Sequence, residues 1–448
     1  MFLEYVGAVK LKGSLLFFKT VEDVQFGEKV IVRSGKRELY GRVVSIEIDI
    51  TLIEILGQTH NLNLEDIKVK FSGEAFKLNV SSQMLGRTLN AFGEPIDNLG
   101  DITTQKKIDI SGSAYNPAKR IHPREYIHTG ISSIDILNTL IKGQKLPIFS
   151  VAGVDIDHLT AQVVRQIQSK NSKSIVVFAA MGIKYESADF FIKNITSDEN
   201  FQNITLFMNL ADEPAVNTLM LARSALSFAE YMAYEKGYDV ITVLYDMSNY
   251  CDALREISAK REEIPSRKGY PGYMYSDLAC IYERAGIFKD KKGTLTQLPI
   301  LSMPDDDITH PIPDLTGYIT EGQIVLDKIL NQKGIYPPIN VLPSLSRLMN
   351  KGVSKQHLRL SSQLYAIYAK SKKVEMLASI VGEGEISSIE KSYLSFGKKF
   401  EKEFLKQGEF ENRSLEESYK ICWSLLENIP KSELLRLKEK DIKEFLNE

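Results

Sequence analysis

The residues that come closest to a phosphate-binding pattern follow a short apolar segment at residues 147–149. A phosphate loop carries Gly-x-x-x-x-Gly-Lys-Ser/Thr between a buried strand and a helix, so that backbone N–H groups and the lysine hold the phosphates. Here Gly153 is the only glycine of the turn, and His158 and Leu159 stand about where the lysine and the hydroxyl residue belong. The sequence predicts a strand, a turn and a helix over 159–167, with Gly153 as a vestigial cofactor-binding position.

Two carboxylates accompany this turn. Asp155 and Asp157 would face the space of the phosphates, where they would repel a polyphosphate. The simpler interpretation is that Asp157 caps the helix, because an aspartate at this position accepts a hydrogen bond from a backbone N–H group. Either way, the turn lacks the catalytic groups of a phosphate loop.

Asp246 is a second candidate, because it follows the apolar segment 240–244. A carboxylate at the C-terminal end of a parallel strand is where Mg²⁺ is held in many nucleotide-binding cores. A turn-forming aspartate is the more common explanation of such a residue. Without a phosphate-loop lysine, we predict only a weak, vestigial cofactor role for Asp246.

No metal site is predicted. The three consecutive aspartates at 305–307 are interpreted as a turn, because neighbouring carboxylates in an extended loop point in different directions. The three cysteines lie far apart in the sequence, which favours reduced thiols over disulfides or a zinc site.

Residues 337–347 are the most specific stretch, with the sequence Pro-Pro-Ile-Asn-Val-Leu-Pro-Ser-Leu-Ser-Arg. The prolines fix an extended course, and Ser344 and Ser346 can bond to nearby backbone groups. Arg347 is therefore expected at a rigid corner rather than on a mobile tail. Taken alone, the pattern also fits an ordinary surface arginine.

The first 75 residues show the alternation of short strands and predict a small β-barrel. Within it we expect one strand face to carry Val44, Ile46, Ile48, Ile50 and Leu52. From 76 to 350, apolar strands alternate with helices, which predicts a mainly parallel sheet covered on both faces. The clearest strands are 174–180 and 240–244, and weaker candidates are 205–208 and 298–301.

Beyond residue 350 the pattern is helical. Apolar residues recur at three- and four-residue steps and predict a buried stripe; they are Ile389, Tyr393, Phe396, Phe400 and Phe404. Residues 414–417 read Ser-Leu-Glu-Glu, a capping-box sequence that predicts the start of another helix.

Composition limits the class of protein. With 448 residues, 43% hydrophobic and 25% charged, the chain fits a soluble globular protein of two to four domains. Lys and Arg number 56 against 58 Asp and Glu, so the net charge of −2 gives no sign of nucleic-acid binding. We expect no signal peptide and no membrane span, and hence a cytoplasmic protein whose membrane role would come through partners.

Residues 337–346 match the signature of the α/β-type subunits of rotary ATPases: Pro, a small residue or Pro, an aliphatic residue, Asp/Asn/His, then Ser-x-Ser. More closely, the chain resembles the non-catalytic B subunits of V-type and archaeal-type ATPases and ATP synthases. Further matching segments run from end to end: 84–87, 95–97, 129–135, 143–150, 180–183, 246–251, 253–257, 269–275 and 307–318.

The chain also departs from related patterns. The family usually has a Gly-Ser-Gly-like turn after position 150, whereas this chain has Val151, Ala152 and Gly153. The catalytic sister subunit would show a true phosphate loop and a Gly-Glu-Arg-like segment after the next strand. Residues 181–186 read Met-Gly-Ile-Lys-Tyr-Glu, without the glutamate after the glycine that would activate water. F-type α subunits resemble a full phosphate loop, so the V- and A-type B subunits are the better match.

The resemblance implies three domains: an N-terminal β-barrel at 1–75, a RecA-like α/β core without a functional phosphate loop at 76–350, and a C-terminal α-helical domain at 351–448. It implies an A3B3 ring with catalytic A subunits, a central rotor stalk, peripheral stalk subunits and a membrane sector. The complex couples ATP synthesis or hydrolysis to H⁺ or Na⁺ transport, and Mg-ATP or ADP is held mostly by the neighbouring subunit. Activity of the isolated chain stays open.

The resemblance also gives Arg347 a role. The matching arginine of B subunits is an arginine finger that reaches in trans to the nucleotide of the A subunit, and Ser344 and Ser346 would position it. One alternative is a RecA-type hexameric motor for nucleic acid or exported protein, but such motors need a lysine-bearing phosphate loop and, for nucleic acid, basic and aromatic strand contacts. The other is a catalytically dead nucleotide-fold interaction protein.

Overall fold

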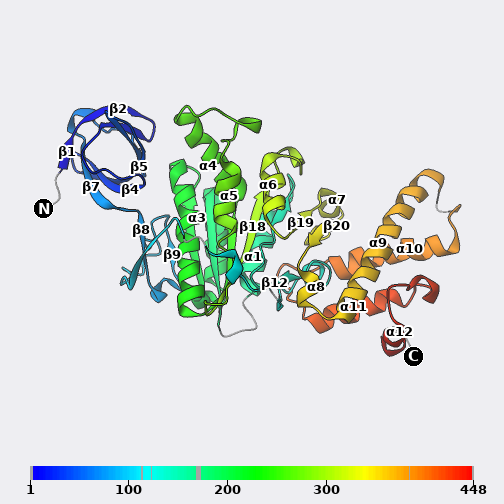
Figure 1. Cartoon of the computed structure of the whole chain (residues 1–448). Helices are drawn as coiled ribbons and strands as arrows, with labels where there is room; N and C mark the ends of the chain where they lie inside the picture. Colours follow the sequence, from blue (N-terminus) through cyan, green and yellow to red (C-terminus); the bar gives the residue numbers. More distant parts are fainter. Residues whose placement is uncertain (1–3, 113–114, 123, 168–172, 383, 446–448) are drawn as a thin grey trace. The chain divides into compact units, whose positions relative to one another are not determined.

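The computed structural model describes residues 4–112, 115–122, 124–167, 173–382 and 384–445 (Figure 1). The chain forms two compact units, and each combines segments that are distant in the sequence. The first unit comprises Met1–Asn116 and Val176–Arg284, and the second comprises Pro117–Ile175 and Ala285–Glu448. The three domain boundaries expected from the sequence stay a prediction.

The N-terminal part of the first unit is a curled antiparallel sheet of seven strands in the order β1-β7-β4-β5-β6-β3-β2 (Figure 1). The edge strands β1 and β2 are separated only by Gly7, so one continuous segment bonds to β7 on one side and to β3 on the other. This connection curls the sheet around an apolar core and confirms the predicted barrel-like domain. The strands are β1 (Glu4–Val6), β2 (Ala8–Lys12), β3 (Leu15–Lys19), β4 (Glu28–Ser34), β5 (Arg37–Ile46), β6 (Ile50–Ile55) and β7 (Lys68–Ala75).

One predicted strand face in this sheet is wrong. Residues 47–49 form the turn between β5 and β6, where the Glu47 N–H donates to the carbonyl of Ile50 at 2.8 Å. Ile46 and Ile48 are exposed, whereas Val43 and Ile53 point into the core. A turn and a bulge within β5 shift the alternation by one residue, and such a shift moves every side chain to the other face.

The rest of the first unit contains strands in the order β16-β14-β15-β9. Their bounds are β9 (Thr88–Leu89), β14 (Ser174–Ile183), β15 (Ile204–Leu210) and β16 (Asp239–Tyr245). Strand β15 runs parallel to both β14 and β9, and the side chains of β14 and β16 are almost all buried. The helices α2 (Tyr185–Thr196), α3 (Ala215–Glu230), α4 (Met247–Lys260) and α5 (Met274–Tyr282) belong to the same unit. The predicted buried strands are confirmed.

The second unit contains strands in the order β20-β19-β13-β18. They are β13 (Ile148–Ser150), β18 (Thr294–Ser302), β19 (Gly322–Leu326) and β20 (Ile339–Ser346). Helix α1 (Ile156–Gln166) follows β13, α6 (Pro311–Ile319) connects β18 to β19, and α7 (Lys328–Gln332) connects β19 to β20. Strand β13 is parallel to β18 and β19, whereas β20 adds an antiparallel edge to β19. The RecA-like, mainly parallel character of the core is therefore confirmed.

Helices complete the second unit, as the sequence predicts. They include α9 (Lys355–Val381), α10 (Ser388–Lys399) with a π-helical continuation (Phe400–Leu405), α11 (Leu415–Leu426) and α12 (Glu439–Phe445). The predicted apolar stripe of residues 389–404 is buried except for Ile389, which is exposed in the first turn of α10. Ser414 and Glu417 form the predicted capping box of α11. Within the described ranges, no helix combines the length and apolar character needed to cross a membrane.

Candidate functional site

The turn after β13 leads directly into α1. Gly153 has a φ of +81°, a conformation that residues with a side chain rarely adopt. Asp155 is the N-cap of α1, and its carboxylate accepts a hydrogen bond from the His158 N–H at 3.4 Å. The expectation that Asp157 caps this helix is wrong. Asp155 has the extended backbone of a cap, whereas Asp157 already lies within the first helical turn.

The polar groups of this turn bond to other parts of the same unit. The Ala152 N–H donates to the carboxylate of Asp306 at 2.6 Å, and the Asn331 side chain donates to the carbonyl of Gly153 at 3.2 Å. His158 lies 2.5 Å from the carboxylate of Glu409 through Nδ1. A carboxylate therefore meets a backbone N–H that a phosphate loop would aim at phosphate, and the turn has no lysine. These residues disfavour a polyphosphate at this turn, and the vestigial cofactor role of Gly153 stays a prediction.

The aspartate run at 305–307 forms a turn, as expected. Residues Pro304–Asp306 make one turn of 3-10 helix, in which Asp306 has a φ of +55°. The Asp307 carboxylate accepts hydrogen bonds from the N–H and the hydroxyl of Thr309 at 2.8 and 2.7 Å. Among the residues whose structure is described, no group of three or more His, Cys, Asp or Glu could hold a metal ion.

Asp246 belongs to the first unit, at the point where β16 passes into α4. Its side chain is buried and accepts a hydrogen bond from the Ser248 N–H at 2.6 Å, so that it serves as the N-cap of α4. This geometry fits the turn-forming role that the sequence allowed. The weak cofactor role of Asp246 stays a prediction.

Arg347 lies in the second unit, directly after the last residue of β20. Its side chain is exposed, and its Nη1 donates to the carbonyl of Thr320 at 3.1 Å. The backbone N–H of Arg347 donates to the carbonyl of Glu321, the residue after Thr320, at 3.0 Å. Both ends of the arginine are thus tied to the segment that opens β19. The guanidinium is presented to solvent at a fixed place.

The two serines before Arg347 bond to backbone groups, as the sequence predicts. Three extra residues of β20 bulge out between the pairs Val325–Asn340 and Gln323–Leu345. The Ser344 hydroxyl bridges this bulge, because it donates to the Asn340 carbonyl at 2.5 Å and accepts from the Val325 N–H at 2.9 Å.

Ser346 is tied to a different segment. Its hydroxyl donates to the carbonyl of Thr139 at 2.8 Å and accepts from the side-chain amide of Gln144 at 3.0 Å. The approach to Arg347 is therefore held at two points, one at the bulge and one at the end of the strand.

Three further polar residues at this place were not predicted: Gln144, Lys145 and Glu321. The Lys145 ammonium lies 2.9 Å from the Glu321 carboxylate, although the lysine side chain is only 3% exposed. Gln144 is fully buried and donates to the carbonyl of Glu321 at 3.0 Å. A single sequence gives no signal for the burial of a lysine, which is ordinarily a surface residue.

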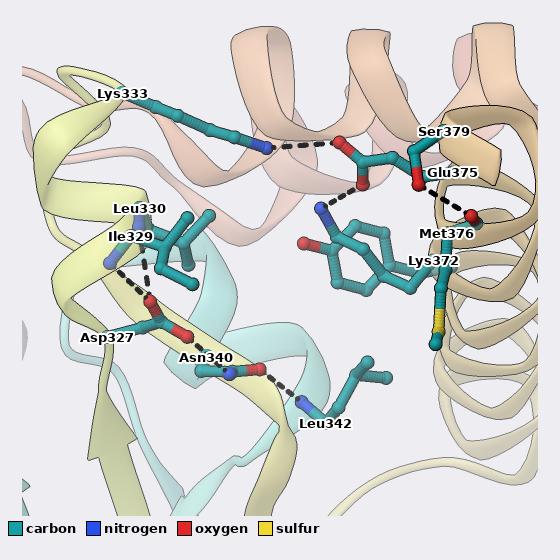
Figure 2. Close-up of a pocket in the computed structure, with 11 residues that line it drawn as sticks. Asp327, Ile329, Leu330, Lys333, Asn340, Leu342, Lys372, Glu375, Met376 and Ser379 are labelled. Carbon is teal, nitrogen blue, oxygen red and sulfur yellow. Dashed lines mark hydrogen bonds and ion pairs between the residues drawn. The ribbon is translucent and has the colours of Figure 1, made fainter.

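A pocket of about 430 Å³ lies at the opposite end of β20 from Arg347. Figure 2 shows Asp327, which accepts from the first N–H groups of α7 and from the side chain of Asn340. Across the pocket, Lys333 and Lys372 pair with Glu375 of α9. Asp327 is thus bonded to neutral donors and the two lysines are paired with Glu375, and the described residues of the pocket wall form no arrangement that indicates catalysis.

Tyr368 forms part of the same pocket wall. Burial and the nearby carboxylate of Glu401 raise the pKa of Tyr368 above its ordinary value, and its hydroxyl donates to that carboxylate at 3.1 Å. Tyr368 is therefore neutral at physiological pH and acts as a hydrogen-bond donor within the helical part of the unit.

Comparisons with known families agree with this architecture. Residues 130–346 match the family model of the ATP synthase alpha/beta family, nucleotide-binding domain. Residues 346–446 match the C-terminal domain of V and A type ATP synthase. The two matches meet at Ser346, immediately before Arg347.

Individual relatives cover nearly the whole chain. The V-type ATP synthase beta chain of Halothermothrix orenii is 48% identical over 450 residues, which span 99% of this chain and 97% of that protein. The solved structure of the ATP synthase subunit NeqB from Nanoarcheaum equitans is 38% identical, with a TM-score of 0.76 over 89% of this chain and 98% of that chain. The chain therefore belongs to the family of V-type ATP synthase beta chains, the B subunits of rotary ATPases.

Proposed function

We propose that this chain is the non-catalytic B subunit that supplies Arg347 in trans to the nucleotide of a neighbouring catalytic A subunit. The observation that carries the proposal is the exposed Arg347 at the end of β20, whose guanidinium donates to the Thr320 carbonyl and whose backbone N–H donates to the Glu321 carbonyl. An arginine that acts on another subunit must be exposed and yet fixed in position. Arg347 meets both conditions.

The chemistry of phosphoryl transfer calls for such a residue. Negative charge spreads over the equatorial oxygens of the transferred phosphoryl group, and a planar guanidinium can bond to several of them at once. An arginine finger supplied in trans is worth roughly 10³ to 10⁵ in rate, or about 4–7 kcal/mol of barrier. A surface ion pair is worth about 0–1 kcal/mol, so the two roles predict clearly different losses.

The wider assembly is part of the same proposal. Three copies of this chain alternate with three A subunits around a central rotor stalk, with peripheral stalks and a membrane sector that moves H⁺ or Na⁺. The complex lies at the cytoplasmic side of the membrane. Mg-ATP or ADP is held mostly by the A subunit, which agrees with the poor fit of the turn at Gly153 to a polyphosphate.

Replacement of Arg347 in a reconstituted A–B complex tests the proposal. We expect Arg347→Ala to leave ring assembly intact while ATP hydrolysis falls by about 10³-fold or more. Arg347→Lys should restore little activity, because a single ammonium cannot replace the planar fork. Steady-state turnover and native mass spectrometry provide the two readouts.

Arg436→Ala is the matched control. Arg436 is also an exposed arginine of the second unit, and its guanidinium bonds within the chain to the Ser362 hydroxyl at 2.5 Å. Its replacement should leave turnover unchanged. Near-normal turnover in an assembled Arg347→Ala ring would instead make Arg347 an ordinary surface residue.

A further inference from the structure

We infer that Gln144 and the ion pair between the buried Lys145 and the partly exposed Glu321 are positioning residues that fix Arg347 for catalysis in trans. The inference rests on the proposed function of Arg347. Its starting point is that both the backbone and the side chain of Arg347 bond to residues 320–321. Whatever holds this segment also sets the position of the guanidinium.

The segment is held by Lys145 through three bonds to one residue. The Lys145 N–H donates to the Glu321 carboxylate at 2.8 Å, and the ammonium contacts the other oxygen of that carboxylate at 2.9 Å. In return, the Glu321 N–H donates to the Lys145 carbonyl at 3.0 Å. Because the ammonium is only 3% exposed, removal of the carboxylate charge would cost the favourable pairing that offsets its burial, and the segment at Glu321 would be held less firmly.

Gln144 joins the two strands that meet at Arg347. Its side-chain nitrogen donates to the Glu321 carbonyl and to the Ser346 hydroxyl, both at 3.0 Å. Its side-chain oxygen accepts from the Ile141 N–H at 2.9 Å, which fixes the orientation of the amide. One buried side chain therefore contacts the residue before Arg347 and the residue that accepts the Arg347 N–H.

The geometry allows little freedom between these strands. A Cβ atom added at Gly322, the residue after Glu321, would lie 2.1 Å from the Leu345 carbonyl oxygen. The strands therefore approach each other closely beside Arg347, and the polar contacts at Gln144 and Lys145 set their relative position. A displacement of about 1 Å in a catalytic group can cost roughly 10²-fold in rate. The contacts of this network thus bear directly on catalysis.

Two variants in the reconstituted A–B complex test this role. Gln144→Leu keeps the size of the side chain but removes its two donated bonds and the one accepted from Ile141. Glu321→Gln keeps the size and one of the two acceptor oxygens but removes the charge. We expect each ring to assemble with little change in KM and a kcat reduced about 10- to 100-fold, because an arginine finger acts mainly in the transition state.

Glu125→Gln provides the control for the ion pair. Glu125 pairs with Lys142 at 2.7 Å in the same stretch of chain, but its side chain is 72% exposed. The same substitution there should leave kcat unchanged. An equal loss in Glu125→Gln and Glu321→Gln would contradict a specific role for the pair of Lys145 and Glu321.

The decisive measurement combines each variant with Arg347→Ala. If Gln144 and Glu321 act through Arg347, the second substitution should change the residual kcat of Arg347→Ala less than about twofold. The same fold-loss in both backgrounds, or a normal kcat in both single variants, would overturn the positioning role. Near-normal turnover of Arg347→Ala alone would refute the proposed function itself, so the two failures can be told apart. If Gln144→Leu does not assemble into a ring, Glu321→Gln alone and in combination with Arg347→Ala provides the same comparison.

Discussion

Asp306 and Arg347 are charged residues of one unit with opposite roles. The Asp306 carboxylate is used inside the chain, where it accepts the Ala152 N–H at 2.6 Å. The Arg347 guanidinium is exposed and keeps most of its donors available, since among the described residues its side chain bonds only to the Thr320 carbonyl. The turn that could have met a phosphate is thus satisfied by an internal anion, while the group suited to phosphate is directed outward.

A third charged residue, Asp97, stabilises the first unit. The side chain of Arg87 donates to it through two bonds of 2.7 Å, and these bonds, with the N–H groups of Thr88 and Leu99, hold the pKa of Asp97 at about 2. The pKa is lower in the folded state, so this stabilisation is present above about pH 4 and is lost as the pH falls toward 2.

We predict that Asp97→Asn lowers the free energy of unfolding at pH 7 by roughly 2 kcal/mol. The difference from the unchanged protein should shrink as the pH falls below about 4, because protonation then removes the same charge. Denaturant unfolding of the purified chain across this pH range measures both effects. Asp189→Asn, at the exposed pair with Lys193, should have no measurable effect at any pH. A loss at Asp97 that does not vary with pH would contradict the assignment.

Strand β20, paired with β19, runs from the pocket to Arg347 in the second unit. Asn340 and Leu342 of β20 line the pocket, and Ser346 at the other end of the strand precedes Arg347. The Ser344 hydroxyl closes the bulge between these ends. The position of Arg347 therefore depends on the pairing of an edge strand and not on a flexible loop.

Gly322→Ala tests this dependence on strand pairing. Gly322 has a φ of +142°, and an added Cβ would meet the Leu345 carbonyl, so we predict a loss of roughly 2–4 kcal/mol in the free energy of unfolding. ATP hydrolysis by the assembled complex should also fall, since the strands must separate beside Arg347. Thermal unfolding and turnover measure the two losses.

The control is Gly334→Ala, at another positive φ of +70° where no atom of the described residues lies within 4 Å of the added Cβ. It should cost only about 1–2 kcal/mol and leave turnover unchanged. Equal effects of the two substitutions would mean that the backbone conformation, and not the close approach of the strands, is what matters at Gly322.

At the scale of the whole chain, the fold is that of the ATP synthase alpha/beta nucleotide-binding family, and the turn at Gly153 lacks the lysine of a phosphate loop. Family membership makes it part of a rotary ATPase. In the proposed function, Arg347 acts only beside another subunit. The proposal therefore assigns this chain a contribution to chemistry that takes place on its neighbour.

We therefore predict that the purified chain alone hydrolyses no ATP. It lacks the phosphate-loop lysine, and in residues 181–186 Ile183 follows Gly182, where a Gly-Glu-Arg-like segment has the glutamate that activates water. Without these groups the charge that develops in the transition state is not stabilised. Turnover should appear only when catalytic A subunits are added to the chain. The control is a mixture of A subunits with the Arg347→Ala chain. Steady turnover by the isolated chain, free of contaminating ATPase, would disprove this prediction.

The sequence by itself determined which parts of the chain are strand-rich, mixed or helical, and it indicated the family. Apolar segments such as 174–180 and 240–244 predict buried strands wherever they occur, because only a covered sheet can bury them on both faces. The capping box at Ser414 is likewise a local signal, since its hydrogen bonds join residues three positions apart. The signature at 337–346 indicated the family and, through it, Arg347.

Only the tertiary structure decided which polar groups meet. Ala152 and Asp306 are 154 residues apart, and Lys145 and Glu321 are 176 apart, yet each pair is joined by a hydrogen bond. Such contacts depend on strand order and register, which the local periodicity of a sequence does not encode. The same reason explains why Ile48 is exposed and not in the predicted strand face: residues 47–49 form a turn, which interrupts the alternation of inward and outward side chains. The sequence thus identified Arg347, while the folded chain determined how that residue is held.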